Sequence, residues 1–254
     1  MRRALVVVSA ALAIAGCGDD ATVSGGGGGD RPQVVVSAAS SMKEALTSCA
    51  PGFADGELRL QFAGSDELAG QIRQGAPVDV FAAASAKLPA ALASEGKLEA
   101  PVEFASNRLV LAVPAAGGKV ASLEDLEQDG VKLVIGAEGV PVGDYTRGVL
   151  EQLGADRSAA ILANVRSNEP DVKGVIGKLT LRAADAGFVY VTDVAATDGR
   201  LKAIELPGDV DATATYAAGV VAAAKQPEAA EAFVDDLLAG GCHDALIAAG
   251  FAEP

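Results

Sequence analysis

The chain has 254 residues, half of them apolar but only 4% aromatic, with no tryptophan, one histidine, three cysteines and a formal net charge of −14. This length and apolar content can bury a large core divided over two lobes, which excludes a disordered protein. The acidic charge argues against nucleic acid as a partner, and the scarcity of aromatic rings argues against a carbohydrate site built on stacking.

The N-terminus reads as a lipoprotein export signal over residues 1–16. Arg2 and Arg3 precede an apolar stretch, 4–15, that is too short for a stable membrane anchor. The stretch ends in Ile-Ala-Gly-Cys, which resembles a bacterial lipobox with Cys17 as the lipidated residue. A plain signal peptide with an incidental cysteine is the alternative. We expect an exported protein anchored to the outer face of the cytoplasmic membrane.

Residues 17–30 contain five consecutive glycines and are expected to form a flexible tether between the lipid and the folded part. Removal of residues 1–16 takes away two arginines and no acid, so the net charge of the mature chain falls to about −16. A site for an anion on such a chain must work through local dipoles and hydrogen bonds.

Beyond the tether, hydrophobic periodicity predicts alternating strands and helices. In the first half we expect strands at 33–37, 57–62, 79–83 and 108–114, and helices at 42–49, 66–74 and 87–95. In the second half we expect a capped helix start at 122–125, strands at 132–136, 186–191 and 217–223, and helices at 144–153, 171–182, 227–238 and 244–249. This alternation predicts an α/β fold with parallel or mixed sheets covered on both faces, whose ligands lie beyond the carboxyl ends of strands.

Two serines follow predicted strands and open predicted helices. Ser40 follows Ala38-Ala39, and Ser65 follows Phe62-Ala63-Gly64. At a helix start the backbone N–H groups lack intrahelical partners and the helix dipole is positive, so both junctions suit an oxyanion. Plain helix N-capping is the alternative for each serine.

A series of motifs in fixed order resembles the bacterial periplasmic molybdate-binding proteins, the solute receptors of ABC importers. The motifs, which span nearly the whole mature chain, are AAS at 38–40, FAGS at 62–65, QIRQGAPVDVF at 71–81, NRLVLAVP at 107–114, GVPVGDYTRGVLEQLG at 139–154, DVKGVIGKL at 171–179, DAGFVYVTDV at 185–194 and GF at 250–251.

The resemblance implies a two-lobe fold of the periplasmic-binding-protein type, each lobe a mixed sheet flanked by helices, with the ligand in the cleft between them. Lobe I is expected at 31–107 plus 217–254 and lobe II at 108–216, with crossings near Arg108 and Tyr216 as the hinge. Family members hold the oxyanion through two serines, two backbone amides and a tyrosine. The matching positions are Ser40, Ser65, Val142, Val172 and Tyr190.

The implied ligand is molybdate, with tungstate expected to bind too, and the implied partner is an ABC permease. We expect a monomer with no cofactor, no metal-cation ligands and no membrane contact besides the lipid. Ionised molybdate offers only hydrogen-bond acceptors, so the ideal site holds donors and no carboxylate, whereas a protonated phosphate needs an acceptor. Asp66 and Asp144 depart from the family pattern and are interpreted as first-turn acids that face solvent.

Cys49 and Cys242 remain beside Cys17. In an exported chain a disulfide between them is the default expectation, with two reduced buried thiols as the alternative.

An enzyme is the competing class. The sequence has no Gly-x-Ser-x-Gly elbow and no HExxH, its GVIGKL at 174–179 lacks the spacing of a P-loop, and its single histidine, His243, lies near the C-terminus. We therefore expect no catalytic residues. Other tetrahedral anions, such as sulfate or phosphate, and a lipoprotein with a vestigial site stay open as alternatives.

Overall fold

The structure is a computed structural model that describes residues 31–254. The predicted export signal, the predicted lipidation site Cys17 and the predicted glycine-rich tether lie outside the described residues. Strands and helices alternate along the described chain and build a mixed nine-stranded sheet in the order β2-β1-β3-β9-β4-β7-β5-β6, with β8 paired to β4. The predicted two-lobe α/β fold is confirmed.

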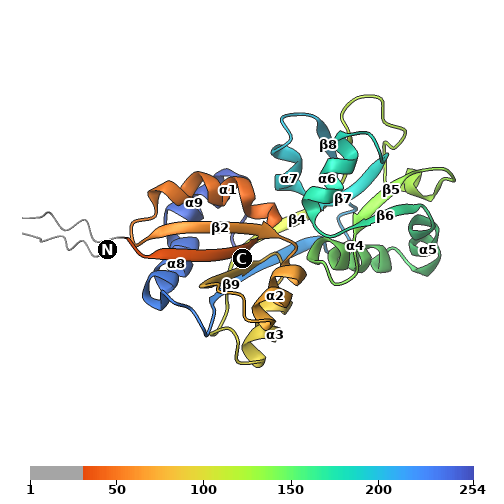
Figure 1. The fold of residues 1–254 in the computed structure, drawn as a ribbon. Coiled ribbons are helices and arrows are strands. Elements are labelled where there is room, and N and C mark those ends of the chain that lie inside the picture. Colours follow the sequence, from red (N-terminus) through yellow and green to blue (C-terminus); the bar gives the residue numbers. More distant parts are fainter. Residues whose placement is uncertain (1–30) are drawn as a thin grey trace, which may run out of the picture. The chain divides into compact units, whose positions relative to one another are not determined.

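The first group of elements, called lobe I, contains the strands on one side of β4 and the helices that pack on them (Figure 1). Its elements are β1 (Gln33–Ala39), η1 (Ser40–Met42), α1 (Lys43–Cys49), η2 (Ala50–Gly52), β2 (Glu57–Ala63), α2 (Ser65–Arg73), β3 (Val80–Ala83), α3 (Lys87–Ser94), β9 (Thr213–Val220), α8 (Pro227–Ala239) and α9 (Gly241–Ala248).

The second group, lobe II, lies on the other side of β4 (Val102–Pro114). Its elements are η3 (Glu124–Glu127), β5 (Leu133–Gly136), α4 (Pro141–Gln152), α5 (Ala155–Ala163), β6 (Val165–Glu169), α6 (Val172–Thr180), β7 (Ala186–Tyr190), α7 (Val191–Ala195) and β8 (Leu201–Ile204).

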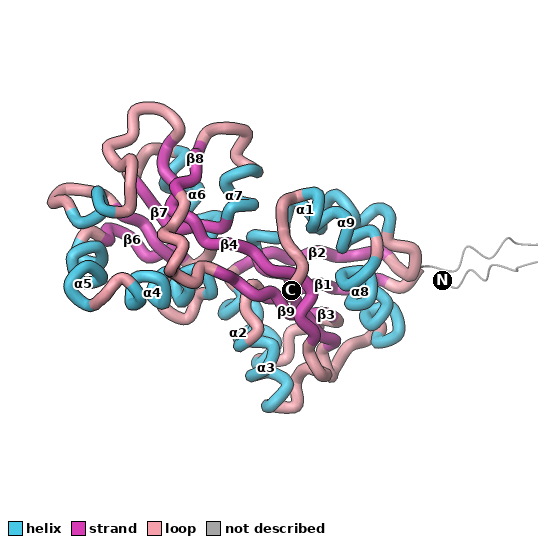
Figure 2. The backbone as a smooth tube through the Cα atoms, turned by 180° about the vertical axis from the view of Figure 1, so that it is seen from behind, coloured by secondary structure: helices cyan, strands magenta, loops and turns pink. Residues whose placement is uncertain are grey.

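Strand β3 shows why lobe I has helices on both faces of its sheet. Successive side chains of a strand point to opposite faces. Accordingly Val80 and Ala82 belong to the core under α1, α8 and α9, whereas Phe81 and Ala83 belong to the core under α2 and α3. Figure 2 shows the two sets of helices on either side of these strands.

Two long antiparallel strands, β4 and β9, run between the lobes (Figure 1). Strand β4 pairs with β9 up to Arg108 and then with β7 from Leu109 onward. Strand β9 pairs with β3 from Ala217 onward. The partner exchange falls at the positions where the sequence predicts the hinge. The exact lobe boundaries stay a prediction.

The parallel pairs β1–β2, β1–β3, β5–β6 and β5–β7 decide where a site can form. Carboxyl ends of parallel strands share one edge of a sheet, and the following helices begin there. Lobe I places the starts of η1 and α2 at this edge, and lobe II places the starts of α4 and α6.

Several predicted elements differ from the observed ones. The helix predicted from Asp144 begins at Pro141, because proline is favoured at the first helical position. The helix predicted from Ser122 is only the 3-10 turn η3. The strand predicted from Arg108 begins six residues earlier as β4. The short elements α5, β6, α7 and β8 have no predicted counterpart.

A disulfide joins Cys49 at the end of α1 to Cys242 in α9, with 5.1 Å between the two Cα atoms. The bond ties the C-terminal helix of lobe I to its first helix, 193 residues apart in sequence. Across residues 31–254, the helices are all too short or too polar to span a bilayer.

Candidate functional site

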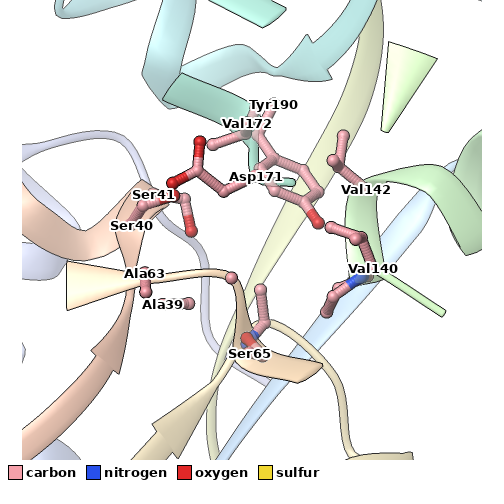
Figure 3. Close-up of a pocket in the computed structure, with 13 residues that line it drawn as sticks. Ala39, Ser40, Ser41, Ala63, Ser65, Val140, Val142, Asp171, Val172 and Tyr190 are labelled. Carbon is pink, nitrogen blue, oxygen red and sulfur yellow. The ribbon is translucent and has the colours of Figure 1, made fainter. Parts of the chain in front are cut away.

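A small cavity lies where the carboxyl-end edges of the two lobes face each other (Figure 3). The cavity is narrow, so it admits only a compact ligand. Both lobes line it, through Ala39, Ser40, Ser41, Ala63, Gly64, Ser65, Ala84, Val140, Pro141, Val142, Asp171, Val172 and Tyr190. All five residues predicted from the sequence are among them.

Ser40 and Ser41 come from the turn η1, directly after β1. The residue before the turn, Ala39, has no side chain that could cap it, so first-turn N–H groups stay free for a ligand. The Ser41 hydroxyl lies 2.8 Å from the Tyr216 hydroxyl, and both are buried. This bond fixes the turn against β9 and keeps Ser40 at the cavity wall.

Ser65 is the first residue of α2 and is 1% exposed. Its hydroxyl oxygen accepts a hydrogen bond from the Ala84 backbone N–H at 3.2 Å. Because the oxygen already serves as an acceptor, the hydroxyl hydrogen is free to be donated into the cavity. Gly64, not Ser65, occupies the N-cap position, so plain N-capping does not explain this serine.

Val142 and Val172 contribute backbone groups from lobe II. Val142 is the second residue of α4, and its N–H is the first in that helix because Pro141 has none. Val172 is the first residue of α6. First-turn N–H groups have no intrahelical acceptor and lie at the positive end of the helix dipole. Both valines therefore place the first turn of a helix beside the cavity that they line.

Tyr190 ends β7 and is 1% exposed. Its hydroxyl is buried and, among the described residues, has no hydrogen-bond partner. Burial raises the pKa of Tyr190 well above its ordinary value, with further contributions from Tyr216 and Tyr145, so the phenol stays protonated and can donate. A buried hydroxyl without a partner costs free energy unless a ligand supplies an acceptor.

Asp171 is the carboxylate that lines the cavity within the described part of the chain, and no lysine, arginine or histidine lines it there. The sequence predicted a lining without any carboxylate, and that prediction is wrong. Asp171 is the N-cap of α6, and its Oδ1 accepts from the Gly174 N–H at 2.8 Å. In Figure 3 its carboxyl group points toward the side where Ser40 and Ser41 lie, away from the Tyr190 hydroxyl.

The two acids that depart from the family pattern do not line the cavity. Asp144 accepts a hydrogen bond from the Gly139 N–H at 2.8 Å and so closes the loop before α4. Asp66 does not fully face solvent as predicted, because its Oδ1 is buried and has no partner among residues 31–254. Burial accordingly raises the pKa of Asp66.

Sequence reasoning missed Ser41, Gly64 and Asp171 at the cavity. Ser41 and Gly64 are direct neighbours of predicted site residues and could have been found by treating each junction as a unit. Asp171 had a signal of its own, since an aspartate directly before a helical pattern is a common N-cap.

Among the described residues, the cavity lining combines several hydrogen-bond donors with one carboxylate, Asp171, and no cationic side chain. Ser40, Ser65, Val142, Val172 and Tyr190 all line this space, the first two and Tyr190 with a hydroxyl in the side chain and the valines in the first turns of α4 and α6. Within residues 31–254 there is also no group of three or more histidine, cysteine, aspartate or glutamate side chains placed to hold a metal ion. Donors at helix N-termini suit a small oxyanion.

This fold and site define a class of extracytoplasmic binding proteins, and comparison with known families agrees. The sequence matches the family described as bacterial extracellular solute-binding protein over residues 34–252. The chain belongs to this family and, within it, to the molybdate-binding proteins that its motifs resemble.

One relative supports this placement, and two solved structures share the fold. The chain is 35% identical to the molybdate-binding protein ModA of Mycobacterium tuberculosis over 228 residues, which covers 87% of this chain and 85% of the relative. The periplasmic molybdate-binding protein of Azotobacter vinelandii has the same fold, with a TM-score of 0.76 and 22% identity over 87% of this chain and 99% of that one. The sulfate-binding protein SubI of M. tuberculosis also shares the fold, with a TM-score of 0.75 and 16% identity over 87% and 86%.

Proposed function

We propose that this protein is an extracytoplasmic receptor that binds molybdate and delivers it to an ABC importer. The observation that carries the proposal is the buried Tyr190 hydroxyl, which lacks a partner among the described residues and lines a cavity at the N-termini of α2, α4 and α6. The names of the M. tuberculosis and A. vinelandii relatives support molybdate as the ligand.

The donor set fits the chemistry of molybdate. At neutral pH this dianion presents four oxygen acceptors and no hydrogen, so each oxygen can be met by a donor. Ser40, Ser65, Val142, Val172 and Tyr190 would supply these donors from both lobes. Tungstate has nearly the same size and charge, and we propose that it binds at the same positions.

A protonated tetrahedral anion, such as hydrogen phosphate, is the second candidate ligand. Asp171 favours it, because a carboxylate at the cavity could accept the hydrogen of the ligand. We prefer molybdate because the Asp171 carboxylate already accepts the Gly174 N–H and points away from Tyr190 in Figure 3.

Calorimetric titration of the purified protein with molybdate, tungstate, sulfate and phosphate tests the ligand. We expect molybdate and tungstate to bind at one site per chain and to compete, with sulfate and phosphate much weaker. Binding of phosphate or sulfate without any response to molybdate would overturn the assignment.

We further propose that the lobes, at 31–107 plus 217–254 and at 108–216, close on the anion about the crossings near Arg108 and Tyr216. Closure would be driven by contacts from both lobes to one ion. A monomer in the closed form would then be recognised by a permease. Among residues 31–254, no hydrogen bond joins a serine of the cavity to a base that could activate it, so we propose binding and no catalysis.

We also propose that a lipid on Cys17 anchors the receptor to the membrane. The motif before Cys17 predicts lipidation, which would hold the receptor at the outer face of the cytoplasmic membrane near its permease. Fractionation of cells that express the wild type or Cys17→Ser tests this. We expect the wild type in the detergent-soluble membrane fraction and the variant released, and equal distribution of both would contradict lipidation.

A further inference from the structure

Lys173 lies beside the cavity but does not line it. It follows Val172 in the first turn of α6, and its ammonium Nζ contacts two carboxylates, Glu44 Oε2 at 2.7 Å and Asp193 Oδ1 at 3.2 Å. Glu44 belongs to α1 in lobe I, whereas Lys173 and Asp193 belong to α6 and α7 in lobe II. The lysine therefore joins the two lobes.

Asp193 holds the lysine from the side of lobe II. Its side chain is fully buried, three residues after Tyr190. A buried carboxylate is costly to leave without a countercharge, so the Lys173–Asp193 pair is expected to persist whatever lobe I does. Burial lowers the pKa of Lys173, but the charges of Asp193 and Glu44 outweigh this effect, so the ammonium stays charged.

Glu44 is the partner of Lys173 that can be replaced by water. Its side chain is 52% exposed, so water can solvate it readily when the lobes separate, whereas the Lys173 side chain is only 26% exposed. Glu44 also lies in the first turn of the helix that follows the Ser40–Met42 turn. An attraction between Glu44 and Lys173 therefore draws the Ser40 wall of the cavity toward the Val172 wall.

We propose that Lys173 is a positioning residue for closure, which captures Glu44 across the cleft and so prolongs the residence of the bound anion. This inference rests on the proposed function. The pair forms only when the lobes meet, so it acts on the closed state and not on the first encounter with the anion. The rate of anion release is then the quantity that the pair controls, while the rate of association stays unchanged.

The decisive variant is Glu44→Gln, which removes the charge in lobe I and leaves the Lys173–Asp193 pair intact. Release is measured with the full chain by chasing bound radiolabelled molybdate with unlabelled molybdate, and association by stopped-flow tyrosine fluorescence. We expect about three- to fivefold faster release, with association unchanged, as for one partly exposed charge pair. Lys173→Met should speed release similarly, and adding Glu44→Gln to it should have no further effect.

Lys178→Met is the matched control on the same helix. Lys178 contacts Glu169 at 3.7 Å, and both residues belong to lobe II, so its loss should leave release unchanged. Thermal unfolding of Glu44→Gln should match the wild type, which separates closure from stability. Wild-type binding with equal release from Glu44→Gln would overturn this inference alone. Failure of the wild type to bind any of the four anions would overturn the proposed function, and this inference with it.

Discussion

Gly64 of lobe I lies against the backbone of Pro170 in lobe II, so closely that a Cβ atom built on Gly64 would stand 2.4 Å from the Pro170 carbonyl oxygen. Gly64 is also the N-cap of α2, and Pro170 precedes α6 by two residues. The two helix starts that line the cavity can approach this closely only because residue 64 has no side chain.

A side chain at residue 64 should disturb the contact with Pro170. Gly64→Ala should weaken anion binding by about tenfold or more, because the added methyl group overlaps backbone atoms of the other lobe when the lobes meet. Gly70→Ala is the control, because Gly70 lies in the same helix, α2, and a Cβ atom built on it would have no neighbour within 4 Å. Affinity is measured by calorimetry. Equal affinities of the two variants would show that the Gly64–Pro170 approach has no part in binding.

Loss of the Tyr190 hydroxyl should affect the affinity for molybdate but not the stability of the fold. Tyr190→Phe should weaken molybdate binding by about ten- to a hundredfold, because a hydrogen bond to a charged group is lost. Its melting temperature should not fall, because the hydroxyl has no partner among the described residues.

Tyr145→Phe is the matched control for Tyr190. The Tyr145 hydroxyl accepts a hydrogen bond from the Thr215 N–H, at 3.1 Å, in β9. Loss of this hydrogen bond should lower the free energy of unfolding by about 1 kcal/mol, with little effect on the affinity for molybdate. Tyrosine fluorescence can follow both variants, since the chain has three tyrosines and no tryptophan. The ring of Tyr190 lies 6.5 Å from that of Tyr145 and 5.9 Å from that of Tyr216. The reverse pattern, with Tyr190→Phe unstable but fully binding, would remove Tyr190 from the site.

Asp171→Asn tests how the cavity tolerates a carboxylate. Asparagine caps a helix about as well as aspartate, so α6 should keep its start. Removal of one negative charge near a dianion should tighten molybdate binding by about three- to tenfold, as expected for Coulomb repulsion at an intermediate effective dielectric constant. Titration calorimetry measures the change. Weaker binding of the variant to phosphate, with none to molybdate, would instead identify Asp171 as the acceptor for a protonated ligand.

The free energy of unfolding should depend on pH because of Asp193. Burial raises the pKa of Asp193 from 3.8 to about 6, although Lys173 and the Tyr190 backbone N–H oppose the shift. The other groups that act on it are Glu44 and the hydroxyls of Tyr190 and Tyr216, whose own pKa values are raised. Because the folded state keeps a proton that the unfolded state has lost, this stabilisation is complete below about pH 4 and is lost as pH rises through about 6.

Chemical unfolding of the wild type and Asp193→Asn between pH 4 and 7 measures this effect. The asparagine variant lacks the titration, so the free energy of unfolding of the wild type relative to the variant should fall by roughly 2–3 kcal/mol across this range. A difference that stays constant from pH 4 to 7 would show that Asp193 does not titrate there.

The sequence predicted the parts of the site that depend on local pattern. Ser40 and Ser65 stand where strand periodicity changes to helix periodicity, and such junctions are readable from the chain alone. The start of α4 was placed three residues late, because the segment around Pro141 contains two glycines and reads as a loop. Strand β6 was missed because four of its five residues are polar, as befits a strand at the edge of the sheet.

The contacts between lobes could not be predicted in this way. Glu44 and Lys173 are 129 residues apart, and neither has a local pattern that marks it as a partner of the other. Gly64 likewise reads as an ordinary N-cap until the Pro170 carbonyl is placed beside it. Such pairs depend on how β4 and β9 join the lobes, which is a property of the tertiary fold.

One molybdate ion should occupy the cavity that both lobes line. A crystal structure of the protein grown with molybdate, with anomalous data collected at the molybdenum absorption edge, would locate the ion. We expect one strong anomalous peak in the cavity, with molybdate oxygens at about 2.6–3.2 Å from the hydroxyls of Ser40, Ser65 and Tyr190 and the backbone nitrogens of Val142 and Val172. Molybdenum found only outside this cavity, in a protein that binds molybdate in solution, would contradict it.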